Sequence, residues 1–151
     1  MQKEAEYFLP FDTSKYPLRI SQGRNGPWSH FLIRKQLPGG IAEIDLINDV
    51  DFALPIGTEV RAARDGRVYG ALLGGTWCYE GLDPQIGLNP PSMGWTNHIV
   101  IVHEDETTAV YSHLGNEKLV EGHQIVKAGD IIAKTGRSGW IAEIPHLHFQ
   151  I

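Results

Sequence analysis

Cysteine is almost absent from the chain, which has Cys78 alone among its 151 residues. An internal disulfide and a zinc site made of paired cysteines are therefore excluded. Long apolar runs are also missing, and the longest, such as residues 99–102, fall far short of the ~20 residues of a membrane span. Charged side chains interrupt the first twenty residues, so no signal peptide is expected in this chain. A metal site here has to be built from histidines and carboxylates.

Positive charge is in short supply as well. The chain has 13 lysine and arginine residues against 18 acidic ones, for a net charge of −5, and no basic run. Proteins that bind nucleic acid carry clustered basic side chains that neutralise phosphates. We therefore expect no nucleic-acid partner, and the short apolar runs predict no membrane span.

Helical periodicity is the third absence. No stretch keeps a 3.6-residue apolar period for three turns, so little helix is expected. The 17 glycines and 9 prolines instead divide the chain into short β-rich segments. The expected strands cover residues 17–20, 47–53, 59–63, 67–73, 98–103, 107–114, 131–135 and 147–151. This spacing predicts an all-β fold, a compact antiparallel sandwich or barrel-like domain over residues 17–151 that follows an N-terminal arm, residues 1–16.

Residues 74–97 are too long for a hairpin turn and have too little pattern for a strand pair. Long ordered loops often carry function, and aromatic ones often line grooves. The segment is expected to be a rim loop that either lines a groove or folds over its own aromatic side chains for stability.

The most informative cluster of histidines is His146 and His148, two residues apart. In a strand both imidazoles would point to one face, while Leu147 and Phe149 enter the core. One imidazole could bind a metal and the other could reach its water ligand, although two half-exposed histidines would give the same pattern.

His113 and Asp51 add two more polar candidates. His113 closes a predicted strand in which Ala109, Tyr111 and His113 are expected to share one face. Asp51 stands in otherwise apolar sequence, where a buried carboxylate is costly unless it is paired or bound to a cation. Metal ligation would explain Asp51.

Several ordered motifs carry a resemblance to a known family. They lie at residues 51–58, 62–68, 111–114, 126–130, 135–139 and 145–149. In this order they resemble the motifs of the lysostaphin/LytM-type zinc metallopeptidases, over roughly residues 45–151. The resemblance implies a compact antiparallel β fold with a groove, one catalytic zinc ion per chain and hydrolysis of peptide bonds in bacterial peptidoglycan. It also implies a place in the cell envelope, periplasmic or extracellular.

The same resemblance makes Asp51 and His148 zinc ligands, and His113 and His146 the catalytic histidines. The third ligand departs from the family pattern, which would place a histidine where this chain has Ile47. His30, which precedes an expected expanded loop over residues 31–45, is the expected substitute, because ligands need only converge in space. Asp49 and Asp45 are the competing candidates, and an incomplete site is the remaining alternative. With His30 as the ligand, replacement of Asp49 is expected to affect zinc little.

Three other histidines and one glycine-rich turn receive structural interpretations. His98 and His103 flank an apolar strand and His123 lies in a turn, so all three are expected to be structural. Residues 136–139 are not followed by an amphipathic helix, which argues against a phosphate-binding loop.

The predicted function is therefore a zinc endopeptidase that acts on peptidoglycan or its peptides. Two histidines and one carboxylate leave zinc an open position for water, and histidine must serve as the base because no HExxH motif is present. The alternative is a non-catalytic peptidoglycan-binding or amidase-activating module of the same family. A sugar-phosphotransferase carrier with a related fold fits the pairing of His146 and His148 with Asp51 poorly. The sequence gives no oligomeric state.

Overall fold

The computed structural model describes residues 6–27, 29–37, 39–88, 96–142 and 144–151. Nearly all of the described elements are short β-strands, as the sequence predicts. In chain order they are β1 (Ile20–Gln22), β2 (Leu32–Leu37), β3 (Gly40–Asp45), β4 (Val50–Ala53), β5 (Glu59–Arg61), β6 (Gly66–Leu72), β7 (Cys78–Tyr79), α1 (Pro84–Gly87), β8 (His98–Val102), β9 (Thr108–Ser112), β10 (Ile125–Val126), β11 (Ile131–Lys134), β12 (Gly139–Trp140) and β13 (His146–Gln150). The all-β prediction is confirmed.

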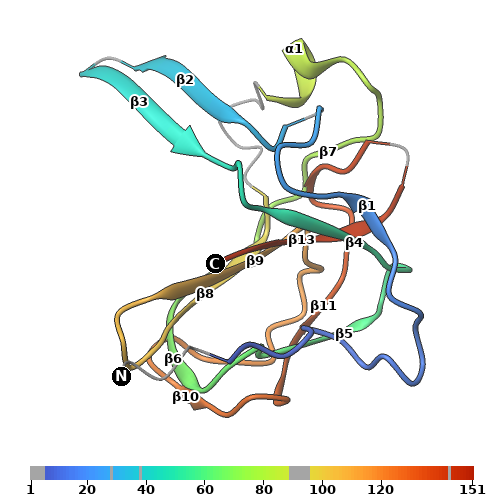
Figure 1. The fold of residues 1–151 in the computed structure, drawn as a ribbon, viewed down its shortest axis with the longest axis vertical. Coiled ribbons are helices and arrows are strands. Elements are labelled where there is room, and N and C mark those ends of the chain that lie inside the picture. Colours follow the sequence, from blue (N-terminus) through green and yellow to red (C-terminus); the bar gives the residue numbers. More distant parts are fainter. Residues whose placement is uncertain (1–5, 28, 38, 89–95, 143) are drawn as a thin grey trace.

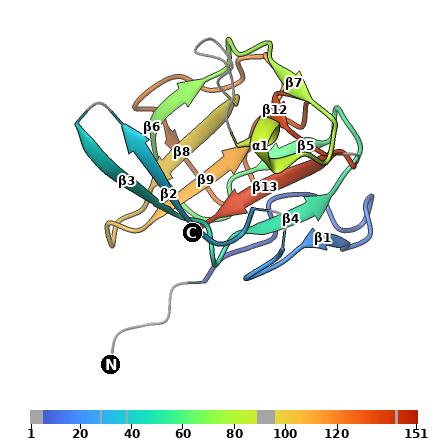
Figure 2. The same cartoon turned by 90° about the horizontal axis from the view of Figure 1, so that it is seen from above.

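One antiparallel sheet dominates the described part of the chain. Its strand order is β1-β4-β13-β9-β8-β6-β10, which brings the C-terminal strand β13 between β4 and β9. The antiparallel pair β5–β11 lies on one side of this sheet, and the β2–β3 hairpin projects on the other side together with α1 (Figure 1). The short strands β7 and β12 pair in parallel. Figure 2 shows how the hairpin stands away from the main sheet.

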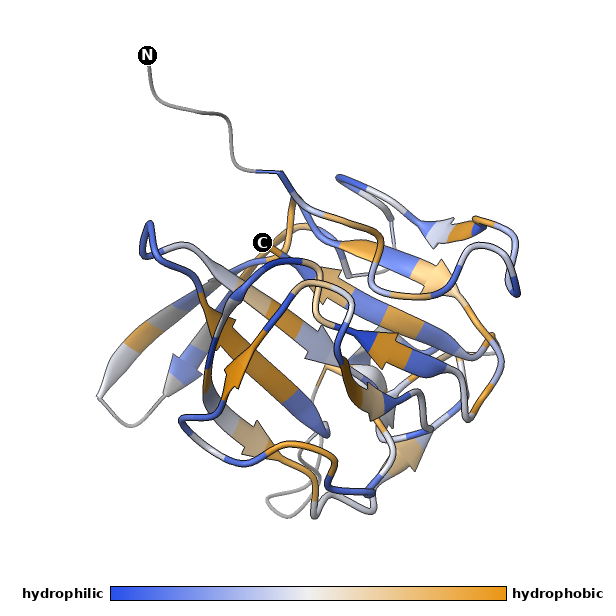
Figure 3. Ribbon diagram, turned by 90° about the horizontal axis from the view of Figure 1, so that it is seen from below, coloured by the Kyte–Doolittle hydropathy of each residue, from blue (hydrophilic) through white to orange (hydrophobic). Residues whose placement is uncertain are grey.

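Alternating side chains explain why the central strands form. In β8, Ile99 and Ile101 are fully buried, and in β9 Ala109 and Tyr111 are fully buried, while their neighbours are more exposed. Figure 3 shows the resulting alternation of apolar and polar positions along the strands. Burial of an aliphatic side chain of this size stabilises the fold by roughly 1.5–3 kcal/mol. These residues form one core cluster with side chains from β4, β5, β6, β11 and β13.

The same alternation in β13 separates the core from the site. Leu147 and Phe149 are buried in the core cluster, as predicted, so His146 and His148 point to the opposite face of the sheet. In β4, Phe52 packs in the core and Asp51 faces the side of the two histidines. Two adjacent strands therefore present polar side chains to one region.

Several strand boundaries differ from the predictions. The first strand begins at Ile20 instead of residue 17, and β4 begins at Val50 because residues 46–49 form a turn in which the Asp49 amide donates to the Leu46 carbonyl. The segment 31–45, predicted as a loop, contains the β2–β3 hairpin. The predicted rim loop 74–97 contains β7 and α1, and its residues 89–95 lie outside the described part.

The described part of the N-terminal arm lies against the core. The Phe11 side chain is buried in the core cluster, the Phe8 amide donates to the Ala63 carbonyl, and the Arg61 amide donates to the Pro10 carbonyl. Residues 6–16 thus contribute to packing beside β5. Among the described residues, no helix has the length and apolar character needed to cross a membrane.

Candidate metal centre

Two strands place Asp51 and His148 opposite each other. In the antiparallel pairing of β13 with β4, His148 is the register partner of Asp51. His148 Nδ1 lies 2.9 Å from Asp51 Oδ1, and the Asp51 side chain is almost completely buried. Cross-strand neighbours are held this close by the backbone ladder itself, so the pair needs no loop to assemble it.

His30 reaches the same carboxylate from the connection between β1 and β2. Its side chain is fully buried, and its Nδ1 lies 3.0 Å from the Gly23 carbonyl oxygen, which can only accept a hydrogen bond. The proton of the neutral ring is therefore on Nδ1, and Nε2 carries the lone pair. His30 Nε2 lies 3.2 Å from Asp51 Oδ1 without the geometry of a hydrogen bond, and no other described residue bonds it.

His30, Asp51 and His148 together form a group that could hold a metal ion. One potential ligand atom from each lies within 4.8 Å of the other two. The structure thus brings together the three residues that the sequence nominates as ligands. Among the residues described, no other group of three histidine, cysteine or acidic side chains has its potential ligand atoms this close together.

The two competing carboxylates, Asp45 and Asp49, are not part of this group of three. Asp45 is exposed at the end of β3, where its Oδ1 accepts a hydrogen bond from the Ile47 amide. Asp49 is buried, but its Oδ2 lies 2.9 Å from His148 Nε2, the ring nitrogen away from Asp51. Neither carboxylate takes the place of His30 beside Asp51.

His113 and His146 lie next to this group with their rings held in the same way. His113 Nδ1 lies 2.8 Å from the Ser138 carbonyl oxygen, and His146 Nδ1 lies 2.8 Å from that of Ile144. Both rings must donate from Nδ1, which leaves Nε2 as the acceptor in the neutral form. The ring centroids of His113 and His146 are 4.6 Å apart, and His146 Nε2 is 3.7 Å from Asp51 Oδ2.

The position of His113 differs from the sequence prediction in one respect. Strand alternation predicted that His113 shares a face with Tyr111, yet Tyr111 is in the core and His113 lines the cavity beside His148. The prediction is wrong because β9 ends at Ser112 and His113 has a left-handed backbone with φ of 62°. Such a conformation costs on the order of 1–3 kcal/mol and is typical of functional sites.

Burial and mutual contacts shift the proton affinities of the cluster. Burial alone would raise the pKa of Asp51, but the facing imidazoles of His148 and His30 outweigh it and hold this pKa well below the usual range. Burial lowers the pKa of His113 to about 3, with a further contribution from His146, and burial also lowers the pKa of His146. At neutral pH, Asp51 is ionised and these two rings are neutral.

His148 behaves in the opposite way. Burial would lower its pKa, but the carboxylates of Asp49 and Asp51 on its two ring nitrogens raise it to about 9. In the protein without metal, the His148 ring is therefore protonated on both nitrogens and positively charged at neutral pH.

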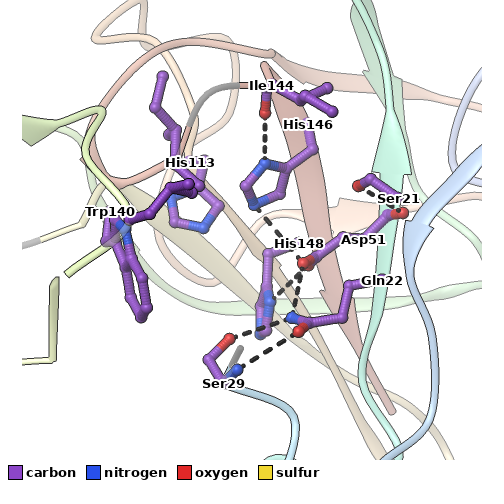
Figure 4. A pocket seen from close by; sticks show the side chains of 12 residues that line it. Ser21, Gln22, Ser29, Asp51, His113, Trp140, Ile144, His146 and His148 are labelled. Atoms are coloured by element: carbon purple, nitrogen blue, oxygen red, sulfur yellow. Dashed lines mark hydrogen bonds and ion pairs between the residues drawn. The ribbon is translucent and has the colours of Figure 1, made fainter. Parts of the chain in front are cut away.

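The cluster lies at the meeting point of two cavities. One has a volume of about 190 Å³ and the other of about 210 Å³, and both are lined by Ser29, His113, Trp140 and His148. Figure 4 shows Asp51, His113, His146 and His148 around the first cavity. The remaining described side chains that line the first are Ser21, Gln22, Leu82, Ile141, Ala142 and Ile144. A groove thus runs across the face that carries the histidines.

Gln22 and Trp140 are among the lining residues that sequence reasoning missed. Gln22 Nε2 donates to Asp51 Oδ2 at 3.2 Å, because β1 pairs with β4 and places Gln22 opposite Asp51. Trp140 forms a wall shared by both cavities, and its Nε1 donates to the Gly81 carbonyl at 2.8 Å. Finding either would require the strand pairing, which no local pattern specifies.

The other histidines lie outside the described lining of both cavities. His103 is buried and bonds the Asp65 carbonyl through Nδ1 at 2.8 Å, and His98 bonds the Thr96 carbonyl in the same way. His123 is exposed in a turn with φ of 68°. Their positions agree with a structural role.

An antiparallel β fold with a histidine and aspartate centre beside a cavity is suited to a metal-dependent hydrolase. The chain matches the model of peptidase family M23 over residues 46–151, and it belongs to this family. Family membership implies a bound metal ion. The match includes Asp51, His113, His146 and His148, whereas His30 precedes it.

Relatives of known activity support this assignment. The glycyl-glycine endopeptidase ALE-1 of Staphylococcus capitis is 34% identical over 107 residues, covering 67% of this chain and 23% of the relative. The peptidoglycan DD-endopeptidase ShyA of Vibrio cholerae is 33% identical over 104 residues, covering 69% and 20%. The chain thus spans about a fifth of the length of these curated relatives. A zinc-containing peptidase from Vibrio cholerae has a similar structure, with a TM-score of 0.59 and 27% identity over 97% of this chain and 36% of that one.

Proposed function

We propose that this chain is a zinc-dependent endopeptidase that hydrolyses peptide bonds in the stem peptides or cross-bridges of peptidoglycan. The observation that carries the proposal is the convergence of His30, Asp51 and His148 within 4.8 Å, with His113 and His146 beside them. The names of the relatives, a glycyl-glycine endopeptidase and a peptidoglycan endopeptidase, support the substrate class. We accordingly place the activity in the cell envelope, where this substrate is found.

The donor set fits one zinc ion per chain. Two imidazoles and one carboxylate are common zinc ligands, and three protein ligands leave the fourth position open, as in catalytic sites. His30 Nε2 supports the fit independently, because it is a buried nitrogen without a hydrogen-bond donor or acceptor in the described chain. A cation beside Asp51 would give this nitrogen a partner.

Zinc bound here would lower the pKa of a water ligand and polarise the scissile carbonyl. His113 and His146 are neutral at pH 7, and each has its Nδ1 fixed on a carbonyl and its Nε2 available. The fixed Nδ1 leaves Nε2 of each ring as the atom that would take a proton from water and return it to the leaving amine. The groove formed by the two cavities would hold the peptide across these nitrogens.

The first prediction concerns metal content and activity together. Protein purified without added metal should contain close to one zinc ion per chain, measured by mass spectrometry of the metal. A chelator should abolish hydrolysis of purified peptidoglycan, followed by the release of amino groups, and added zinc should restore it. A protein that refuses zinc would contradict the proposal, and a protein that binds zinc and peptidoglycan without cleavage would be the non-catalytic module.

The second prediction concerns pH. Because the pKa of His148 is raised to about 9, zinc must displace a proton from this ring below that pH. The apparent zinc affinity should therefore rise by about tenfold per pH unit from near neutrality and level off above about pH 9. Competition with a chelator of known pH dependence, at fixed ionic strength, measures this. An affinity that does not change between neutrality and pH 9 would show that His148 is uncharged before zinc binds.

A further inference from the structure

Asp49 is a buried carboxylate that the proposed reaction does not use. It is the residue before β4, and its side chain is 1% exposed. A buried ionised carboxylate costs several kcal/mol unless charged or hydrogen-bonding groups compensate it. Within the described chain neither of its oxygens has a well-aligned hydrogen-bond donor. Its burial therefore needs an explanation.

The neighbour of Asp49 is the outer edge of the His148 ring. Asp49 Oδ2 lies 2.9 Å from His148 Nε2, while Nδ1 of the same ring lies 2.9 Å from Asp51 Oδ1. The distance is that of a charge-assisted hydrogen bond, although the N–H is not well aligned with the oxygen. Two carboxylates thus bracket one imidazole, one toward the metal centre and one away from it.

We propose that Asp49 is the positioning residue of His148, which holds the ring proton on Nε2 so that Nδ1 is left to bind the metal. This inference rests on the proposed function, since it assigns a role toward the zinc ion. Ligating histidines commonly give their second ring nitrogen to a carboxylate or carbonyl, which fixes the tautomer and the orientation of the ring. Asp49 would supply this partner for His148.

The other three imidazoles of the cluster show why His148 needs such a residue. His30, His113 and His146 each place Nδ1 on a backbone carbonyl, and Nε2 of His30 and of His146 faces Asp51. His148 is turned the other way, with Nδ1 toward Asp51 and Nε2 outward. For the other three rings a backbone carbonyl accepts the ring proton. For the reversed ring of His148, the carboxylate of Asp49 is the acceptor.

Charge balance gives a second reason. Zinc with Asp51 as its charged ligand would leave a net positive charge in a buried centre, because the two histidine ligands are neutral. The Asp49 carboxylate beside His148 would offset this charge. Since His30 is fully buried and both aspartates nearly so, an uncompensated charge there would be costly.

The test compares two variants of Asp49 with a control variant of the neighbouring residue, Asn48. The sequence alone predicts little effect of Asp49 on zinc, but its position 2.9 Å from His148 Nε2 changes this expectation. Asp49→Ala should weaken zinc binding by about 10–100-fold, the range usual for outer partners of metal-ligating histidines. Asp49→Asn should recover part of this loss, because its amide oxygen can still accept from Nε2. Asn48→Ala, at the exposed position next to it, should bind zinc like the unchanged chain. Zinc affinity is measured by chelator competition, and folding by circular dichroism.

The proton on His148 Nε2 distinguishes a positioning role of Asp49 from a merely structural one, because a structural role would not change its exchange. Nitrogen NMR of the zinc-loaded protein should show a proton on His148 Nε2 in the unchanged chain and in Asp49→Asn. In Asp49→Ala that proton should exchange faster with water. A change in overall stability alone would not act on this single ring.

Failure of this inference can be separated from failure of the proposed function. If the unchanged chain binds no zinc, the proposed function fails. If it binds zinc and Asp49→Ala binds equally well with the same Nε2 proton exchange, the role of Asp49 is overturned. If Asp49→Ala loses zinc completely while His30→Ala keeps it, Asp49 is a ligand and the inference is also overturned.

Discussion

His30→Ala should lose zinc and peptidase activity together. With His30 as a ligand, the variant keeps two protein donors, and its zinc affinity should fall by more than the roughly 100-fold that the loss of an outer partner can cause. Removal of the ring also leaves the Gly23 carbonyl without its donor, so some stability should be lost as well. Metal content after dialysis and affinity by chelator competition measure the effect.

His103 offers a matched control for this experiment. It is another buried histidine that bonds a backbone carbonyl through Nδ1, but it is not in the group of three potential ligands. His103→Ala should lose comparable stability and keep its zinc. Retention of zinc by His30→Ala would show that the third ligand comes from elsewhere in the chain.

His113→Ala should lose activity while it keeps zinc. General acid–base assistance is typically worth ~10²–10⁴-fold in rate, or about 3–5 kcal/mol of barrier, so hydrolysis should fall by this factor. His113 is not in the group of three potential ligands, so metal content should stay near one per chain. Peptidoglycan hydrolysis and metal analysis on the same preparation measure the two quantities.

The backbone at position 113 requires a second variant. Alanine at φ of 62° is strained, whereas asparagine tolerates this region. His113→Asn can still donate to the Ser138 carbonyl but cannot take up a proton, so it should fold well and be equally inactive. His148→Ala is the contrasting variant, which should lose metal and activity together. A folded His113→Asn protein without zinc would identify His113 as a ligand, and a fully active one would show that it has no part in catalysis.

Local patterns predicted the parts of the site that lie within single strands. The alternation in β13 was enough to separate Leu147 and Phe149 from His146 and His148, because a strand has a fixed period of two. The same rule failed at His113, where one left-handed residue after β9 reverses the face. A period can be read from sequence, but the residue at which it ends is decided by the packing around it.

Contacts between distant segments were beyond the sequence. The hairpin β2–β3 was predicted as a loop, although glycines at positions 39 and 40 are typical of a tight turn. The hydrogen bond from Gln22 to Asp51 depends on the pairing of β1 with β4. The position of Asp49 on His148 depends in the same way on the register of β4 with β13.

The origin of the three candidate ligands has a mechanical consequence. They come from the connection after β1, from β4 and from β13, the last strand of the chain. An ion held by all three would crosslink residue 30 to residue 148 and close most of the chain into a loop. Crosslinks over long loops restrict the unfolded chain most strongly. The single cysteine of this chain excludes an internal disulfide. The metal would therefore be the crosslink that joins the connection after β1 to strand β13.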